Sequence, residues 1–207
     1  MYIDDRVLKK NQNGNKYCFA VYEAERTEVI LGRSGSAEDD VLVSNCKQDN
    51  VPIRKRLGGG GTVLLSKGII IISAAGVTSI PFQLREHMNA VNNTIIHILT
   101  AFGVKNLAIR GISDIALDHR KVLGSSLARR KDLILYQGCL LVNPDLKLFD
   151  IYLKHPKKEP DYREGRTHRE FLTSLWNEGY KINNIDFISA IKERLAKNAP
   201  WSSLPVY

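Results

Sequence analysis

The sequence has few cysteines, and the three present, Cys18, Cys46 and Cys139, lie far apart in the chain. This sparse, odd set argues against a disulfide framework and against a zinc knuckle. Long hydrophobic runs are also missing: the longest, 68–77, is interrupted by Ser73 and is far too short to cross a bilayer. The N-terminus shows no basic segment followed by an apolar one, so no secretory signal is visible. We therefore expect a cytoplasmic protein without a membrane partner.

The overall composition is that of an ordinary globular protein. Hydrophobic residues make up 43% and charged residues 25% of the 207 positions, which excludes disordered and fibrous classes. The formal net charge of +8 suits nucleic acid, anionic lipid or an acidic protein partner. The basic residues lack the interleaved aromatic residues typical of a single-strand binding face, which disfavours a nucleic-acid partner.

The order of β-rich and helical segments favours an α+β fold. Neither an internal repeat nor a Pro/Gly-rich linker divides the chain, so we expect one domain over residues 1–207. The clusters of strands and helices are unequal rather than strictly alternating, which indicates a largely antiparallel or mixed sheet. The expected strands are 17–22, 28–31, 51–54, 62–65, 68–73, 107–110, 115–117, 120–125 and 133–142; the expected helices are 37–49, 84–102, 145–153, 168–178 and 186–196; and 154–167 is expected to be a mobile loop or lid.

A run of four glycines follows Arg56 in the segment Arg56–Val63. Successive glycines leave backbone N–H groups unhindered, so these groups can converge on phosphate oxygens beside the guanidinium. The segment is neither a Walker loop nor a dinucleotide fingerprint, because no Gly-Lys-Ser/Thr ends it and β-like residues follow it. A flexible hairpin without a ligand remains the alternative.

A second candidate is Lys121, which lies in the otherwise apolar stretch before Gly124. If it points inward, its ammonium could hold a carboxylate or phosphate as charge shifts in a transition state. The alternative is a lysine in a hairpin turn that faces solvent.

Together, these motifs resemble the lipoate–protein ligases of the biotin/lipoate ligase superfamily, over most of the chain. The resemblance lies in the Gly-Arg strand end 29–33, the glycine segment 56–63, the turn 111–114, the lysine motif 120–125, the strand and Asn-x-Asp-Leu 138–146 and the lid end 169–175. It implies a class II aminoacyl-tRNA synthetase/biotin synthetase-like fold, with a mixed, mostly antiparallel sheet packed with helices.

The resemblance also implies a reaction. Lipoate attacks ATP with Mg²⁺ to give lipoyl-AMP, and a lysine of an acidic lipoyl carrier domain, of the 2-oxoacid dehydrogenase E2 or glycine cleavage H protein type, then takes the lipoyl group. Lys121 is the implied catalytic residue, bridging the lipoyl carboxylate and the α-phosphate. The residues implied to bind cofactor and substrate are Arg56, Gly59, Gly60, Gly61, Thr62, Val63, Leu64, Asp114 and Lys121. No residue is assigned to a metal.

The chain departs from the family pattern at two positions and in its length. Leu65 and Gln137 stand where the family usually has histidine, which could weaken catalysis or alter the acyl substrate. The chain ends at Tyr207, just past the catalytic domain, so we expect no C-terminal accessory domain and allow for a separate accessory subunit.

Two other functions remain open. An octanoyl- or lipoyl-transferase of the same superfamily would use a cysteine to form an acyl-thioester, but no cysteine lies between Gly103 and Lys121. Cys139, in an apolar run, is expected to be buried and inert. A homologue that binds carrier proteins without catalysis is the third possibility.

Overall fold

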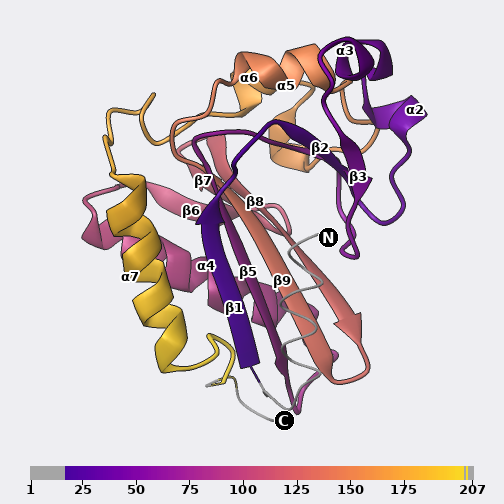
Figure 1. Ribbon diagram of the computed structural model, residues 1–207. Coiled ribbons are helices and arrows are strands. Elements are labelled where there is room, and N and C mark those ends of the chain that lie inside the picture. Colours follow the sequence, from indigo (N-terminus) through magenta and orange to yellow (C-terminus); the bar gives the residue numbers. More distant parts are fainter. Residues whose placement is uncertain (1–16, 203, 205–207) are drawn as a thin grey trace.

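The computed structural model describes residues 17–202 and residue 204, and its strands form two sheets (Figure 1). In the larger sheet every strand is antiparallel to its neighbours, and in the smaller sheet β2 is parallel to β3 and antiparallel to β4. The α+β class and the mixed, mostly antiparallel strand arrangement are therefore confirmed. The larger sheet has the order β1 (Tyr17–Glu23), β5 (Ile69–Val77), β9 (Leu133–Leu141), β8 (Arg120–Arg130), β7 (Asp114–Leu117), β6 (Leu107–Arg110), and the smaller has the order β3 (Ile53–Lys55), β2 (Glu28–Leu31), β4 (Val63–Leu65).

One face of the larger sheet is covered by two long helices, α4 (Leu84–Ala101) and α7 (Asn184–Lys197), as Figure 1 shows. Their apolar side chains and those of the sheet form one core. Helix α4 ends where the sequence predicts: Gly103 has φ +88°, its N–H bonds to Thr100 O, and the N–H of buried Val104 bonds to Leu99 O. This paired bonding satisfies the last carbonyls of the helix.

At one end of the opposite face of the larger sheet lie the smaller sheet and four short helices. These helices are α2 (Ala37–Asp40), α3 (Val43–Gln48), α5 (Lys147–Tyr152) and α6 (His168–Phe171). Their apolar residues form a second core with β2 and β4. The glycine segment 56–62 connects β3 to β4 beside this second core, so it lies over the face of the sheet that α4 does not cover.

Two of the expected helices are wrong in extent. The segment 37–49 is two short helices, because Val41 leaves the helix to form a β-bridge with Leu153. The helix expected over 168–178 ends at Phe171, since the following residues bond to the sheet instead: Thr173 N–H to Lys121 O and Leu175 N–H to Leu141 O. The segment 172–176 thus lies between the start of β8 and the end of β9.

The other differences concern length. Strand β8 continues to Arg130 rather than stopping at 125, and it forms a hairpin with β9 through Lys131, whose φ is 55°. The expected lid 154–167 contains a short 3₁₀ helix, η1 (Asp161–Arg163).

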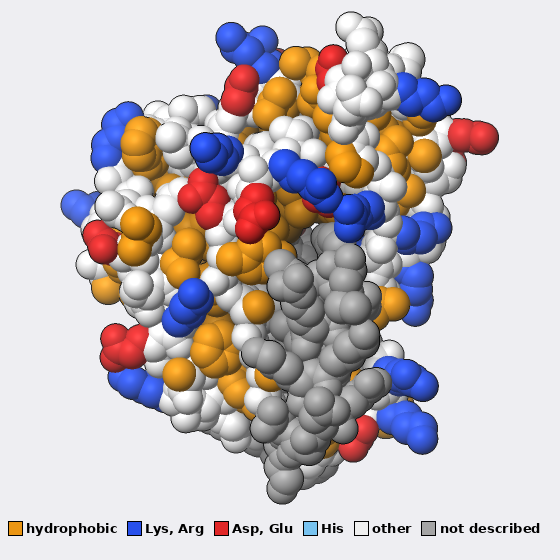
Figure 2. Space-filling model, in the orientation of Figure 1, with side chains coloured by type: hydrophobic (Ala, Val, Ile, Leu, Met, Phe, Trp, Pro, Cys, Tyr) orange, Lys and Arg blue, Asp and Glu red, His pale blue; other side chains and the backbone are white. Residues whose placement is uncertain are grey.

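The positive charge is spread out: on the face in Figure 2, Lys and Arg side chains are distributed around the surface rather than gathered in one patch.

Candidate active site

Lys121 lies in the interior of the site, held by a carboxylate. Its Nζ is 2.8 Å from Asp114 Oδ1, with the side chains of Lys121 and Asp114 only 24% and 8% exposed. Gly124 makes this position possible, because a Cβ there would lie 2.7 Å from the lysine Nζ and 2.8 Å from its Cε. The lysine side chain therefore lies across the space that any other residue at position 124 would fill. The alternative of a solvent-facing hairpin lysine is wrong.

A β-bulge sets the direction of this lysine. In the pairing of β7 with β8, Asp114 is opposite Gly124 and Ala116 is opposite Lys121, so Val122 is an extra residue without a partner. Side chains on a regular strand alternate between faces, and residues 121 and 124 would then point to opposite faces. The extra residue removes this mismatch and places Lys121, Asp114 and Gly124 on one face of the sheet.

A tyrosine from the lid completes the group. The Tyr162 hydroxyl donates to Asp114 Oδ2 at 2.9 Å, so both carboxylate oxygens of Asp114 are engaged. Burial, together with the negative charge of Asp114, raises the pKa of Tyr162, which keeps the phenol protonated and able to donate. Tyr162 was not among the predicted site residues, because a single tyrosine in a polar loop carries no sequence signal.

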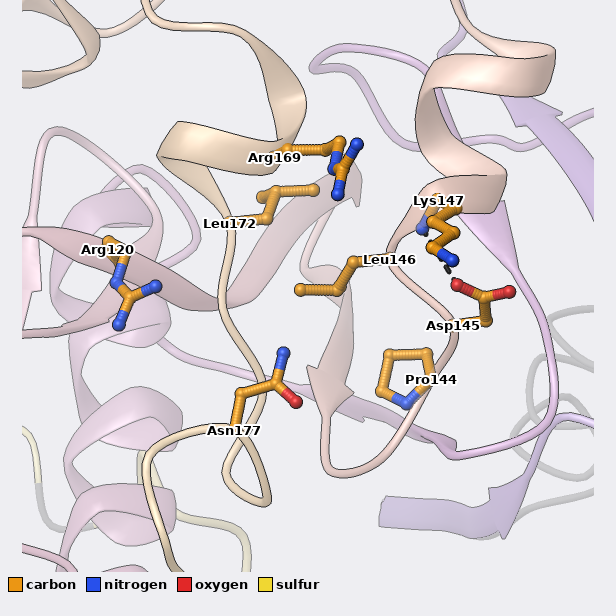
Figure 3. A pocket seen from close by; sticks show the side chains of 8 residues that line it. All are labelled: Arg120, Pro144, Asp145, Leu146, Lys147, Arg169, Leu172 and Asn177. Atoms are coloured by element: carbon orange, nitrogen blue, oxygen red, sulfur yellow. Dashed lines mark hydrogen bonds between the residues drawn. The ribbon is translucent and has the colours of Figure 1, made fainter.

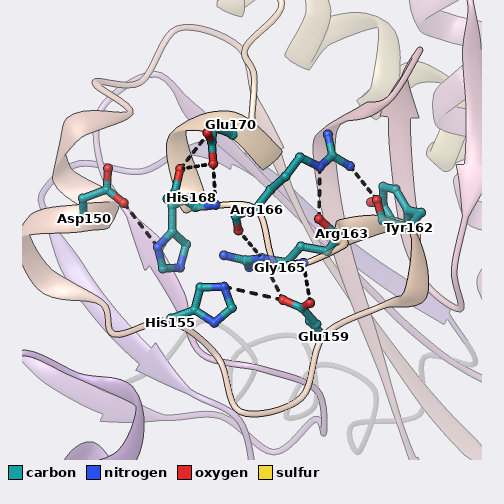
Figure 4. Close-up of polar contacts among 10 residues, drawn as sticks. Asp150, His155, Glu159, Tyr162, Arg163, Gly165, Arg166, His168 and Glu170 are labelled. Atoms are coloured by element: carbon teal, nitrogen blue, oxygen red, sulfur yellow. Dashed lines mark hydrogen bonds and ion pairs between the residues drawn. The ribbon is translucent and has the colours of Figure 1, made fainter.

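The lid segment that carries Tyr162 is braced by two arginines (Figure 4). Arg163 Nε donates to Arg166 O, Arg166 Nε donates to Arg163 O, and both guanidinium groups lie over the ring of Phe171. Arg166 also bonds to His119 O, just before the lysine motif. Nearby, burial and the positive charge of Arg163 lower the pKa of His168 to about 4. These contacts hold the lid over Asp114.

The glycine segment folds around Arg56, which is 8% exposed. The guanidinium donates to Gly59 O at 2.7 Å, to Gly61 O at 2.8 Å and to Ile30 O at 3.4 Å. A side chain at Gly32 would meet Gly60 O at 2.0 Å, so the loop packs directly on the end of β2. Arg56 therefore fixes the loop's backbone through the carbonyls of the loop itself. Its contact with a phosphate stays a prediction.

The remaining predicted residues continue from this loop into β4. Thr62 Oγ1 donates to Asp40 Oδ2 at 2.7 Å, which ties the loop to α2. Val63 is half-buried, whereas Leu64 and Leu65 are 1% and 6% exposed within the second core. Leu65 therefore packs as an ordinary core residue at the position where the resemblance expects histidine.

The glycine loop and Lys121 face the same side of β8. A Cβ on Gly58 would lie 2.9 Å from Ser126 Oγ and 3.3 Å from Gln137 Oε1. Ser126 follows Gly124 by two positions, and the pairing of β8 with β9 is regular there, so both residues point to one face. Two positions along a strand span about 7 Å. The loop and the ammonium thus converge on one stretch of sheet.

Polar side chains without partners lie on this same face. Gln137 is paired across the sheet with Ser126 on β8 and with Ser73 on β5. Both Ser73 Oγ and Gln137 Oε1 are buried, and within the described residues neither has a hydrogen-bond partner. Burying a polar atom in this way costs about 1–3 kcal/mol. The substitution of glutamine for the expected histidine therefore leaves an unsatisfied acceptor beside the glycine loop.

Within residues 17–202 and 204, no group of three or more His, Cys, Asp or Glu side chains could hold a metal ion. No helix in this part of the chain is both long and apolar enough to cross a membrane.

Comparison with known proteins identifies relatives over nearly the whole chain. The family model described as "Lipoyl protein ligase A/B catalytic domain" matches residues 1–196. The curated "Lipoate-protein ligase A subunit 1" of Thermoplasma acidophilum is 23% identical over 83% of this chain and 68% of its own length. Five other curated lipoate-protein ligases are covered over only 30–45% of their length.

Solved structures share the fold. A structure of a bi-partite lipoate protein ligase and its E2 lipoyl domain from Thermoplasma acidophilum has a TM-score of 0.78 at 21% identity, covering 96% of this chain and 75% of that one. A lipoate-protein ligase A bound with ATP has a TM-score of 0.76 at 21% identity, covering 96% and 76%. The expected ligase-like α+β fold is confirmed.

Proposed function

The chain belongs to the lipoyl protein ligase A/B catalytic family, and from this premise we propose that it activates lipoate with ATP and transfers the lipoyl group to a lysine of a lipoyl carrier domain. The observation that carries the proposal is the ammonium of Lys121, fixed by Asp114 on the same face of β8 as the glycine loop. Solved relatives described as bound with ATP and as paired with an E2 lipoyl domain support the choice of substrates.

In the first step, a carboxylate oxygen of lipoate attacks the α-phosphorus of ATP, and the bond from that phosphorus to pyrophosphate breaks. Lys121 bridges the carboxylate and the α-phosphate, while the backbone of the glycine segment binds phosphate oxygens. A charge-assisted hydrogen bond of this kind contributes about 1.5–3 kcal/mol, which is one to two decades in rate if it forms mainly in the transition state. Magnesium arrives as MgATP and lowers the negative charge that the phosphates present.

In the second step, the amine of the carrier lysine attacks the carbonyl carbon of lipoyl-AMP. The bond from that carbon to the phosphate oxygen breaks, AMP leaves, and the amine proton passes to solvent. Val63 and Leu64 border the acyl chain, and Asp114 keeps the Lys121 ammonium beside the leaving phosphate. Because Lys121 is held by Asp114 Oδ1 and Asp114 is itself fixed by Tyr162 through Oδ2, the ammonium needs little rearrangement as charge develops.

The test uses the chain with lipoate, MgATP and the unmodified lipoyl domain of an E2 subunit. We expect pyrophosphate release and a mass increase of the domain, both lost in Lys121→Met and largely lost in Lys121→Arg. Synthetic lipoyl-AMP, supplied in a parallel assay, isolates the second step. If activation needs an accessory subunit, the chain alone will lipoylate the domain from lipoyl-AMP but will not lipoylate it from lipoate and ATP. Wild-type rates in Lys121→Met would contradict the proposal.

A second candidate, an acyltransferase that forms a thioester, is favoured by the position of Cys139. This residue is half-buried rather than buried as expected, and it pairs with Gly124 across β8 and β9. Paired residues have Cβ atoms about 4.5–5.5 Å apart, and the Gly124 Cβ position is the one beside Lys121 Nζ. The thiolate would attack the carbonyl carbon of an acyl-carrier thioester and expel the carrier thiolate; the acceptor lysine amine would then attack the Cys139 thioester, forming the amide and returning the free thiol. A stable acyl adduct on Cys139, absent in Cys139→Ala, supports this candidate over the first.

A further inference from the structure

A hollow of about 290 Å³ opens at the surface beside the start of β8 (Figure 3). Its walls come from β8, from the turn after β9 with the first residue of α5, and from α6 with the segment that follows it. We call it the basic hollow, and its residues used below are Arg120, Asp145, Leu146, Lys147, Arg169 and Leu172.

The positive side chains of the basic hollow are only partly neutralised. Arg120 pairs with Glu178. Arg169 and Lys147 are exposed, and neither has an ion-pair partner among the described residues. Guanidinium groups bind carboxylates through paired N–H donors, and an ammonium binds them as a point charge. The hollow therefore offers two available cations to an acidic group.

The remaining lining points to a protein surface rather than to a nucleotide. Leu146 and Leu172 supply apolar contact, and the Asp145 carboxylate, which accepts from the Lys147 N–H, repels a doubly charged phosphate. Pockets that enclose a small molecule measure about 300–1,000 Å³ and bury most of its surface. The basic hollow is at the lower limit of that range and open to solvent. A protruding loop with acidic side chains fits it better.

The basic hollow lies next to the candidate active site through the backbone. Arg120 immediately precedes Lys121, and Leu172 forms a parallel β-bridge with Lys121. Adjacent residues on a strand point to opposite faces, so Arg120 and the Lys121 ammonium lie on the two sides of the start of β8, while Leu172 brings the hollow to the face that carries the ammonium. A standard interface buries about 800 Å² per partner, which is wide enough to include both.

From these observations we propose that the basic hollow docks acidic side chains on the surface of the acceptor protein and thereby directs the acceptor lysine to Lys121. The inference rests on the proposed function, since it concerns the partner of the same site. Charges at the rim of an interface act mainly on the association rate and on its salt dependence. The hollow therefore acts on acceptor binding and not on the chemistry of lipoate activation.

The experiment compares wild type with the double variant Lys147→Glu/Arg169→Glu. Transfer from synthetic lipoyl-AMP to an unmodified E2 lipoyl domain is measured at several salt concentrations, and pyrophosphate exchange with lipoate and MgATP is measured separately. We expect the KM for the domain to rise about tenfold or more at low salt, with a much weaker salt dependence, and pyrophosphate exchange to be unchanged. The matched control, Lys192→Glu/Lys197→Glu on α7, has the same net charge and is expected to behave as wild type.

Three outcomes overturn the inference: an unchanged KM in the double variant, an equal rise in the control, or loss of pyrophosphate exchange, which would place the nucleotide in the hollow. If wild type itself transfers nothing, the proposed function fails separately. Direct binding of the same lipoyl domain to wild type and variant, measured by interferometry, then decides the docking question: weaker binding to the variant alone supports it, and equal binding overturns it.

Discussion

Replacing Gly124 by alanine is expected to displace Lys121, the proposed catalytic residue, while the strand that carries it stays folded. The new methyl group would lie 2.7 Å from Lys121 Nζ and 2.8 Å from its Cε, where ordinary contacts begin at 3.4 Å. The ammonium must therefore retreat by about 0.7 Å, the difference between 3.4 and 2.7 Å. Asp114 Oδ1 lies 2.8 Å from Nζ and 3.8 Å from the methyl position, so the movement shifts the ammonium sideways relative to Asp114.

The expected loss of activity is large relative to the loss of stability. A misplacement of about 1 Å in a reacting group can lower a rate by about 100-fold, so we expect a 10- to 100-fold slower lipoyl transfer. The atoms that must move are the end of a flexible side chain, and Gly124 does not require a positive φ. The crowding of Lys121 by the new methyl group and the lower chain entropy of the unfolded alanine variant oppose each other, which leaves the free energy of unfolding within about 1 kcal/mol of wild type.

The measurement is single-turnover transfer from lipoyl-AMP, together with thermal unfolding of each variant. Gly124→Ser should be slower still, because its side chain is larger, and Ala128→Ser, which adds one heavy atom further along β8, should resemble wild type. Full activity in Gly124→Ala would refute the reasoning, since it would mean that the position of the ammonium does not matter. Loss of activity accompanied by a fall in melting temperature of more than about 4 °C would point to a damaged strand instead.

Three further predictions follow from individual contacts. Tyr162→Phe removes the bond to Asp114 Oδ2, and we expect a transfer rate about 10-fold lower with an unchanged melting temperature; an unchanged rate would show that the lid tyrosine has no positioning role. Gln137→Leu removes a buried acceptor that lacks a partner in the described part of the chain. We expect the free energy of unfolding, measured by urea denaturation, to rise by about 1 kcal/mol. A clear decrease in that free energy would contradict the expectation. The pKa of His168 in the folded chain is about 4, below its ordinary value of 6.5. As the pH falls from 6.5 to 4, the unfolded chain therefore binds a proton before the folded chain does, and the free energy of unfolding decreases by at most about 3 kcal/mol. In His168→Gln the melting temperature should vary less over that pH range; equal variation would exclude His168 as the cause.

The sequence was sufficient for features that depend on local pattern. The period of apolar residues and Gly103 predicted helix α4 and its end, because both are set by neighbours within one or two turns. The glycine run was singled out for its unhindered backbone and Lys121 for its apolar surroundings, and their order in the chain gained weight only from the family that it resembles. The strands themselves also followed from local β-rich runs, although their division into two sheets did not.

Features that depend on distant segments could not be predicted. The direction of Lys121 depends on the bulge at Val122, which arises from the register of β8 against β7 and not from any residue type. The helix expected after Phe171 failed because sheet bonds to Lys121 and Leu141 replace helical ones. The contact of Tyr162 with Asp114 joins residues 48 positions apart, and neither residue signals the other.

The segment after α6 completes the sheet late in the chain, because the Thr173 N–H bonds to Lys121 O and the Leu175 N–H bonds to Leu141 O. The start of β8 leaves the ribosome some fifty residues before the segment that completes its pairing. A nascent chain that has emerged only as far as β9 lacks the backbone donors that hold Lys121 in place. The start of β8 can therefore reach its final form only after the segment 172–176 has also emerged.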